Sequence, residues 1–74
     1  MISLAQLEAG QVAQVVAIHS ESQGRLLKLS AFGLVPGVFL KLQQRSPAYV
    51  LRIGETMVSL DAEVAREIQV RVEG

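Results

Sequence analysis

The sequence has no cysteine and no tryptophan, and its aromatic side chains are one tyrosine and two phenylalanines. The absence of cysteine excludes disulfide bonds, thiolate zinc sites and a cysteine nucleophile. An excess of one charge is also absent, because seven lysines and arginines balance seven aspartates and glutamates. A protein that binds nucleic acid through counterion release needs a cationic surface. We therefore expect no nucleic-acid partner.

Long hydrophobic runs are absent as well. Residues 29–40 carry no charge, but they include two glycines and a proline and fall short of the ~18 apolar residues that cross a bilayer. The first residues lack the basic region and long apolar run of a signal peptide. We expect a cytoplasmic protein without direct membrane insertion. Half of the residues are apolar, which suffices for one small core, so a single domain over residues 1–74 is predicted.

Residues 26–33 predict a short helix that ends at a glycine. Apolar side chains at 26, 29 and 32 recur at helical spacing, with two more at 27 and 31. Gly33 follows at the position where many helices end in a left-handed residue. In the resulting Schellman motif, Leu34 folds back onto Leu29.

The dipeptide Pro36-Gly37 predicts that the chain reverses directly after this helix. Proline favours the second position of a β-turn, and glycine supplies the positive φ that a type II turn needs at its third position. A strand then starts at Val38. Within this corner we expect Phe32 and Leu34 to lie in the core and Val35 to be exposed.

Three segments after the corner predict an antiparallel meander, because residues 38–45, 49–53 and 56–60 each alternate in polarity. Two-residue loops at Ser46-Pro47 and Gly54-Glu55 would join them, the second with the glycine-first sequence of a type II′ turn. Both loops place inward residues opposite inward residues: Leu42 with Leu51, Leu40 with Ile53, Leu51 with Val58, Ile53 with Thr56, and Tyr49 with Leu60. A slip by one residue would expose this whole set.

The two ends of the chain complete a mainly β fold. At the N-terminus, we predict a helical turn capped by Ser3, a strand over residues 11–18 that is buried on much of both faces, and a loop over 19–24. At the C-terminus, Asp61 is the predicted N-cap of a helix over 62–67, followed by a strand over 69–72. The sequence therefore predicts a small, closed SH3-like β-barrel of about five antiparallel strands with two short helices.

Three parts of the sequence resemble FeoA domains. Residues 28–37, K-L-S-A-F-G-L-V-P-G, are similar to that family's L-x-x-L-G-[LM]-x-P-G stretch. The opening Leu4-x-x-Leu7-x-x-Gly10 is similar as well, and so is the ending Val58-Ser59-Leu60 with Glu63-Val64-Ala65-x-x-Ile68-x-Val70. The resemblance implies an SH3-like accessory protein of bacterial ferrous iron transport that docks on the cytoplasmic GTP-binding domain of the transporter FeoB. The same barrel also resembles the C-terminal domain of iron-dependent repressors, which leaves a regulatory or self-associating module as the alternative.

Seven residues are candidates for binding a protein partner. On the outer face of the meander, Lys41 faces Arg52, and because facing like charges are unfavourable, a partner carboxylate would relieve them. The apolar side chains nearby belong to Phe39, Val50 and Met57, and the corner adds Lys28 and Val35. The competing interpretation is an ordinary solvated face with scattered apolar side chains.

No motif indicates catalysis or a cofactor. The chain lacks the G-x-x-x-x-G-K-[ST] phosphate loop, and no serine has a base placed by a motif, so we expect no enzymatic activity. His19 and Glu21 could bind a ferrous or other divalent ion weakly, since imidazole and carboxylate both suit such ions. One histidine and one carboxylate are few ligands, and an exposed loop histidine is the favoured interpretation.

Overall fold

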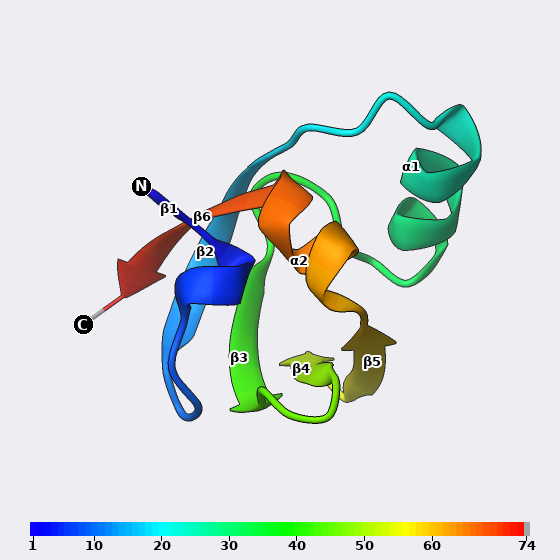
Figure 1. The fold of residues 1–74 in the computed structure, drawn as a ribbon. Coiled ribbons are helices and arrows are strands. Elements are labelled where there is room, and N and C mark those ends of the chain that lie inside the picture. Colours follow the sequence, from blue (N-terminus) through cyan, green and yellow to red (C-terminus); the bar gives the residue numbers. More distant parts are fainter. Residues whose placement is uncertain (74) are drawn as a thin grey trace.

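The computed structural model describes residues 1–73, which form one six-stranded antiparallel sheet, two α-helices and a 3₁₀ helix (Figure 1). In chain order the elements are β1 (Ile2–Ser3), η1 (Leu4–Gln6), β2 (Val12–Ile18), α1 (Gln23–Ala31), β3 (Phe39–Gln44), β4 (Tyr49–Ile53), β5 (Thr56–Leu60), α2 (Ala62–Glu67) and β6 (Ile68–Glu73). The strands are ordered β1-β6-β2-β3-β4-β5 in the sheet.

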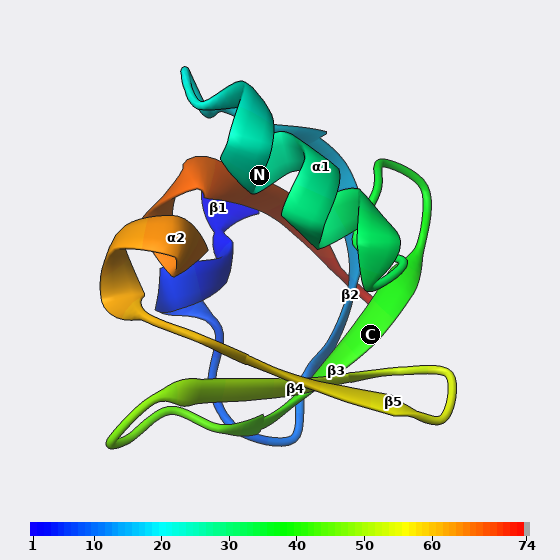
Figure 2. The same cartoon turned by 90° about the vertical axis from the view of Figure 1, so that its right-hand side faces the viewer.

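The sheet curls into the SH3-like shape that the sequence predicts, but it does not close. Figure 2 shows the strands bending around a common centre, with α1 and α2 on the rim. Within residues 1–73, β1 and β5 are the two edges of the sheet and do not pair with each other. The strand β1 was not predicted, because two residues, Ile2 and Ser3, pair with Val70 and Gln69 and are too few to show a periodicity.

The inner face of the curled sheet carries the core. Its largest fully buried side chains come from every part of the chain: Leu4, Leu7, Val15, Leu34, Leu40, Leu42, Leu51, Ile68 and Val70. β2 is less buried than expected. Its Ala13 and Val15 are buried on the inner face, whereas on the other face Val12 is exposed and Gln14 and Val16 are half-buried, because the second face of this sheet meets solvent.

The meander has the predicted register. Ile53 pairs with Thr56 and Leu51 with Val58 across the Gly54-Glu55 loop. Gly54 has a φ of 60°, and no residue other than glycine has a positive φ in the described part of the chain, which identifies a type II′ turn.

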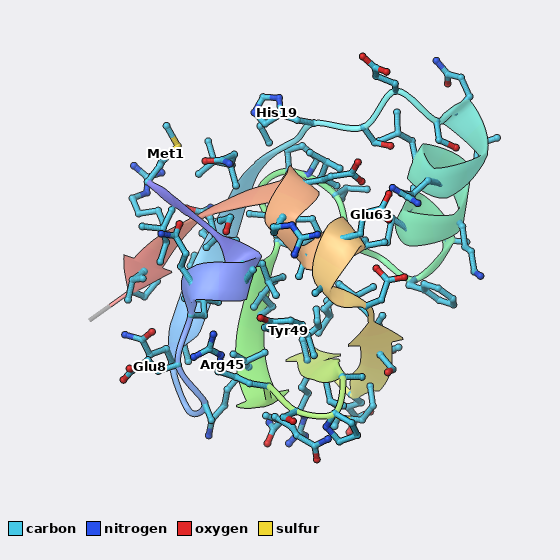
Figure 3. The ribbon with its side chains drawn as sticks, in the orientation of Figure 1. Met1, Glu8, His19, Arg45, Tyr49 and Glu63 are labelled. Atoms are coloured by element: carbon cyan, nitrogen blue, oxygen red, sulfur yellow. The ribbon has the colours of Figure 1, made fainter. Side chains whose placement is uncertain are left out.

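The predicted two-residue loop at Ser46-Pro47 is wrong. β3 ends at Gln44 and β4 begins at Tyr49, so residues 45–48 form the connection. A register shift between Leu42 and Gln44 inserts an extra residue into β3, and this bulge keeps Leu42 opposite Leu51 in spite of the longer loop. Arg45 and Tyr49 then both donate hydrogen bonds to the carbonyl of Ala5 in η1, at 3.0 and 3.3 Å (Figure 3).

The glycine cap after α1 is confirmed. Gly33 has a φ of 85°, the Leu34 N–H donates to the Leu29 carbonyl at 3.0 Å, and the Gly33 N–H donates to the Ser30 carbonyl at 2.9 Å. These are the two hydrogen bonds of a Schellman motif. The type II turn follows, with Gly37 at a φ of 100° and Val38 donating to Val35 at 3.3 Å.

Two expectations about this corner need correction. α1 begins at Gln23, inside the predicted loop, because the hydroxyl of Ser22 accepts a hydrogen bond from the Arg25 N–H and caps the helix. Phe32 is 40% exposed and does not belong to the core, whereas Leu34 is fully buried as expected. The helix ends at Ala31, so the helical spacing that places Phe32 beside Leu29 does not continue to residue 32.

The C-terminal elements follow the prediction closely. The Asp61 carboxylate accepts a hydrogen bond of 2.9 Å from the Val64 N–H and begins α2. The last strand runs over Ile68–Glu73, longer than predicted, and pairs with both β2 and β1.

Candidate functional site

The outer face of the sheet is built by the alternation of its strands. In β3, Leu40 and Leu42 point into the core, so Phe39 and Lys41 lie on the solvent side, where Phe39 is 52% exposed. The same alternation places Arg52 of β4 and Met57 of β5 outside, because Leu51 and Val58 are buried.

Four outward residues form one row across neighbouring strands. Val12 pairs with Lys41, Lys41 with Arg52, and Arg52 with Met57. The two cations are therefore adjacent in the centre, with an exposed apolar side chain on either side. Arg52 Nε donates to the carbonyl of Gly54 at 2.9 Å, and neither cation has an ion-pair partner among residues 1–73.

A second row lies beside the first. Phe39 pairs with Gln14, and Gln14 pairs with Arg71. The Gln14 amide nitrogen donates to the carbonyl of Gly37 at 3.1 Å, while its oxygen accepts from Arg71 at 3.5 Å. Gln14 is thereby held between Arg71 and the turn before β3, next to the exposed ring of Phe39.

The structure brings five of the seven predicted partner-binding residues onto this outer face, namely Phe39, Lys41, Val50, Arg52 and Met57. Val50 is half-buried and so contributes less accessible surface than the other four. Lys28 and Val35 lie elsewhere: Lys28 is on α1, and Val35 is in the turn between α1 and β3.

A second feature, a cleft of about 330 Å³, lies between α1, the end of β5 and the start of α2. Its lining combines apolar and charged side chains: Gly24, Arg25, Lys28, Leu29, Phe32, Ser59, Leu60, Asp61 and Val64. Figure 2 looks onto the side of the molecule where these elements lie. The exposed position of Phe32 has its explanation here, because the ring forms part of the cleft wall.

An ion pair connects the two helices at this cleft. Arg25 Nη1 lies 2.8 Å from Glu67 Oε1 and 3.6 Å from Glu63 Oε1. The hydrogen bond and charge of Glu67 raise the pKa of Arg25 above its ordinary value, so the guanidinium stays charged. Lys28, one turn further along α1, has no ion-pair partner within residues 1–73.

This cleft was not predicted from the sequence. Its walls come from three separate segments, and the ion pair joins residues that are 42 positions apart. The available signal was the spacing of Glu63 and Glu67, which places two carboxylates on one face of α2.

The structure does not complete a metal site around His19. In the part of the chain that it describes, no group of three or more histidine, aspartate or glutamate side chains could hold a metal ion. Figure 3 shows His19 between β2 and α1, apart from the labelled carboxylates of Glu8 and Glu63. Within residues 1–73, no helix is long and apolar enough to cross a membrane.

Comparison with protein families gives one match. Residues 2–72 match the family model described as the FeoA domain. No curated protein matches the chain.

Solved structures share the fold. FeoA from Chlorobium tepidum has a TM-score of 0.91 at 22% identity, covering 99% of this chain and 71% of that one. Stenotrophomonas maltophilia FeoA, a procaryotic SH3 domain protein solved with zinc, has a TM-score of 0.83 at 18% identity, with coverages of 96% and 91%. IdeR from T. acidophilum has a TM-score of 0.91 at 21% identity, but the 97% of this chain that aligns corresponds to 34% of that protein.

Proposed function

The chain belongs to the FeoA domain family, and on this premise we propose that it is a cytoplasmic accessory protein of bacterial ferrous iron transport. In this proposal it has no catalytic activity of its own and docks on the cytoplasmic GTP-binding domain of FeoB. The observation that carries the docking proposal is the row of Val12, Lys41, Arg52 and Met57 on the outer face.

The two adjacent cations, Lys41 and Arg52, repel each other. Side chains directly opposite each other on neighbouring strands have Cβ atoms about 5 Å apart, a distance at which like charges are destabilising. Along the row, Glu73 is separated from Lys41 by Val12, so the nearest carboxylate of the row is not adjacent to either cation. A carboxylate supplied by a partner would offset this repulsion with two attractions.

The apolar residues supply the second part of the argument. Met57 is 55% exposed and Phe39 is 52% exposed, so both can lose water-accessible area when a partner covers them. Protein interfaces are enriched in aromatic, methionine and arginine side chains relative to the remaining surface, and this face has all three types. The outer face therefore has the composition of a protein-docking surface.

A titration with charge-reversed variants tests the proposal. The purified protein would be titrated against the cytoplasmic domain of the same organism's FeoB, with the wild type compared with Arg52→Glu and Lys41→Glu. Arg66→Glu is the matched control, because Arg66 is exposed on α2 and the change in net charge is identical. We expect the two outer-face variants to bind FeoB at least tenfold more weakly than the wild type, and the control to bind with wild-type affinity.

The salt dependence gives a further check. If partner carboxylates meet the two cations, the affinity of the wild type falls as the ionic strength rises, and that of Arg52→Glu falls less. Wild-type affinity of a folded Arg52→Glu variant would refute docking through this face.

A regulatory or self-associating module is the second candidate. It is favoured by the likeness to T. acidophilum IdeR, in which a fold of this kind forms about one third of a longer chain. Analytical ultracentrifugation of the protein alone, combined with the FeoB titration, would distinguish the two candidates. A stable oligomer that fails to bind FeoB favours the regulatory module, and a monomer that binds FeoB favours the accessory role.

A further inference from the structure

The free edge of β5 is an unprotected strand. Thr56–Leu60 reads T-M-V-S-L, without charge or proline, and its pairing with β4 has no bulge. Sheets normally protect an exposed edge by one of these devices or by making the edge strand very short, because free backbone groups are a template for another strand. The opposite edge has this protection, since β1 consists of Ile2 and Ser3 alone.

The hairpin geometry identifies the backbone groups that are free. A two-residue loop makes Ile53 and Thr56 a hydrogen-bonded pair, and hydrogen-bonded pairs alternate with non-hydrogen-bonded ones along the ladder. The N–H and C=O groups of Met57 and Ser59 therefore point away from β4. No backbone hydrogen bond from other parts of residues 1–73 reaches these two residues.

The cleft lies at the C-terminal end of this strand. Ser59 and Leu60 at the end of β5 line it, and Leu29, Phe32 and Val64 supply apolar walls from the two helices. A strand added to β5 would alternate like β5 itself, so every second side chain would point to the inner side, where Leu60 and the cleft lie. A volume of about 330 Å³ can accept an apolar side chain there.

The other side chains of an added strand would project on the outer face beside Met57 and extend the row that contains Arg52 and Lys41. Arg52 would lie two strand spacings away, about 10 Å, which long arginine and glutamate side chains can span across Met57. Lys28 lines the cleft and is also without an ion-pair partner among residues 1–73, whereas Arg25 is paired with Glu67 and Glu63, and Asp61 caps α2. The cations that remain available favour acidic residues in the added segment.

We propose that the groove between α1 and the free edge of β5 binds an extended segment of a partner protein by strand addition. The segment alternates apolar side chains, which enter the cleft, with acidic side chains, which lie on the outer face. Its backbone pairs with the N–H and C=O groups of Met57 and Ser59. The inference depends on the proposed function for the identity of the partner, and not for this mode of binding.

Designed peptides test the inference without FeoB. The probe is a blocked peptide Glu-Val-Glu-Leu-Glu-Val, added to the ¹⁵N-labelled full chain. One control peptide has lysine in place of each glutamate, and a second is N-methylated at the residues whose N–H groups would face β5. We expect saturable shifts of the Met57 and Ser59 amide signals, slower hydrogen exchange at both, and at least tenfold weaker binding of each control.

A pair of protein variants gives an independent measurement. Ser59→Pro removes an outward N–H at an edge position that tolerates proline, whereas Ser59→Ala keeps that N–H. We expect the peptide to bind the alanine variant like the wild type and the proline variant at least tenfold more weakly. If the proline variant does not fold, the N-methylated peptide tests the complementary hydrogen bonds, in which peptide N–H groups donate to the outward carbonyls of Met57 and Ser59.

Three results would overturn the inference. The first is no shift at Met57 and Ser59 at millimolar peptide, and the second is equal binding of the N-methylated peptide. The third is a concentration-dependent dimer that protects the same two amides, since the edge would then serve a second copy of the chain. If the protein binds FeoB but not the peptide, strand addition is refuted and docking on FeoB is not. If it binds the peptide but not FeoB, the choice of partner is refuted.

Discussion

Replacing Gly33 tests whether the corner after α1 has the conformation that organises the fold. Gly33 has a φ of 85°, and a Cβ built there would have Ile53 Cγ2 as its nearest neighbour at 4.0 Å. Because 4.0 Å is an ordinary contact, a small side chain has room, and the cost of substitution comes from the backbone conformation. A left-handed residue other than glycine costs about 1–2 kcal/mol, so Gly33→Ala should lower the free energy of unfolding by that amount.

A second glycine provides the control. Gly24 lies in α1 without a positive φ, and the nearest atom to a Cβ there is Ser22 Oγ at 3.9 Å. Gly24→Ala should therefore stabilise the protein by about 0.5 kcal/mol, because alanine restricts the unfolded chain and suits the helix. The two variants make the same chemical change and should shift stability in opposite directions.

Urea unfolding followed by far-ultraviolet circular dichroism measures both changes. Domains of this size unfold with free energies of about 5–15 kcal/mol, so the midpoint of Gly33→Ala should fall clearly while the slope stays unchanged. Thermal unfolding should show a decrease of about 4–8 °C per kcal/mol. If Gly33→Ala were as stable as the wild type, the left-handed cap would not contribute as we argue.

Three further comparisons test other parts of the structure by the same assay. Leu34→Ala should lower the free energy of unfolding by about 2–5 kcal/mol, because the side chain is fully buried. Phe32→Ala should lower it by less than about 1 kcal/mol, because Phe32 is 40% exposed. A larger loss of stability for Phe32→Ala would contradict the observed corner. Asp61→Ala should cost about 1 kcal/mol through loss of the hydrogen bond that caps α2, and an unchanged midpoint would contradict that role. A double-mutant cycle on Arg25→Ala and Glu67→Ala should give a coupling of at most about 1 kcal/mol that decreases with salt, and a coupling independent of salt would contradict an ion pair in contact with solvent.

Much of the fold could be predicted because its signals are local. The strands Tyr49–Ile53 and Thr56–Leu60 have the predicted bounds, since alternation and a glycine-first loop fix both period and register. The bulge in β3 could not be predicted, because Gln43 and Gln44 at the shift are both polar and hide the change of phase in the alternation. The exposure of Phe32 was also missed, because it depends on where α1 ends and on what lies across from it.

Of the two candidate surfaces, the outer face could be predicted from the sequence and the cleft could not. The facing positions of Lys41 and Arg52 follow from strand register, which the sequence specifies, so the outer face could be predicted. The cleft depends on how α1 packs beside β5 and α2, and Leu29 is the one α1 residue that is buried among those described. The apolar spacing in α1 predicts a helix, but it does not predict which elements the helix packs against.

Chemical-shift mapping shows whether the outer face binds FeoB. The ¹⁵N-labelled protein would be titrated with the unlabelled cytoplasmic domain of FeoB, with and without GTP, and the amide signals followed residue by residue. We expect saturable shifts at Phe39, Lys41, Arg52 and Met57, with the signals of His19 and Arg66 unchanged. Saturable shifts confined to His19, Arg66 and their neighbours, or no shifts in either nucleotide condition, would contradict docking through the outer face.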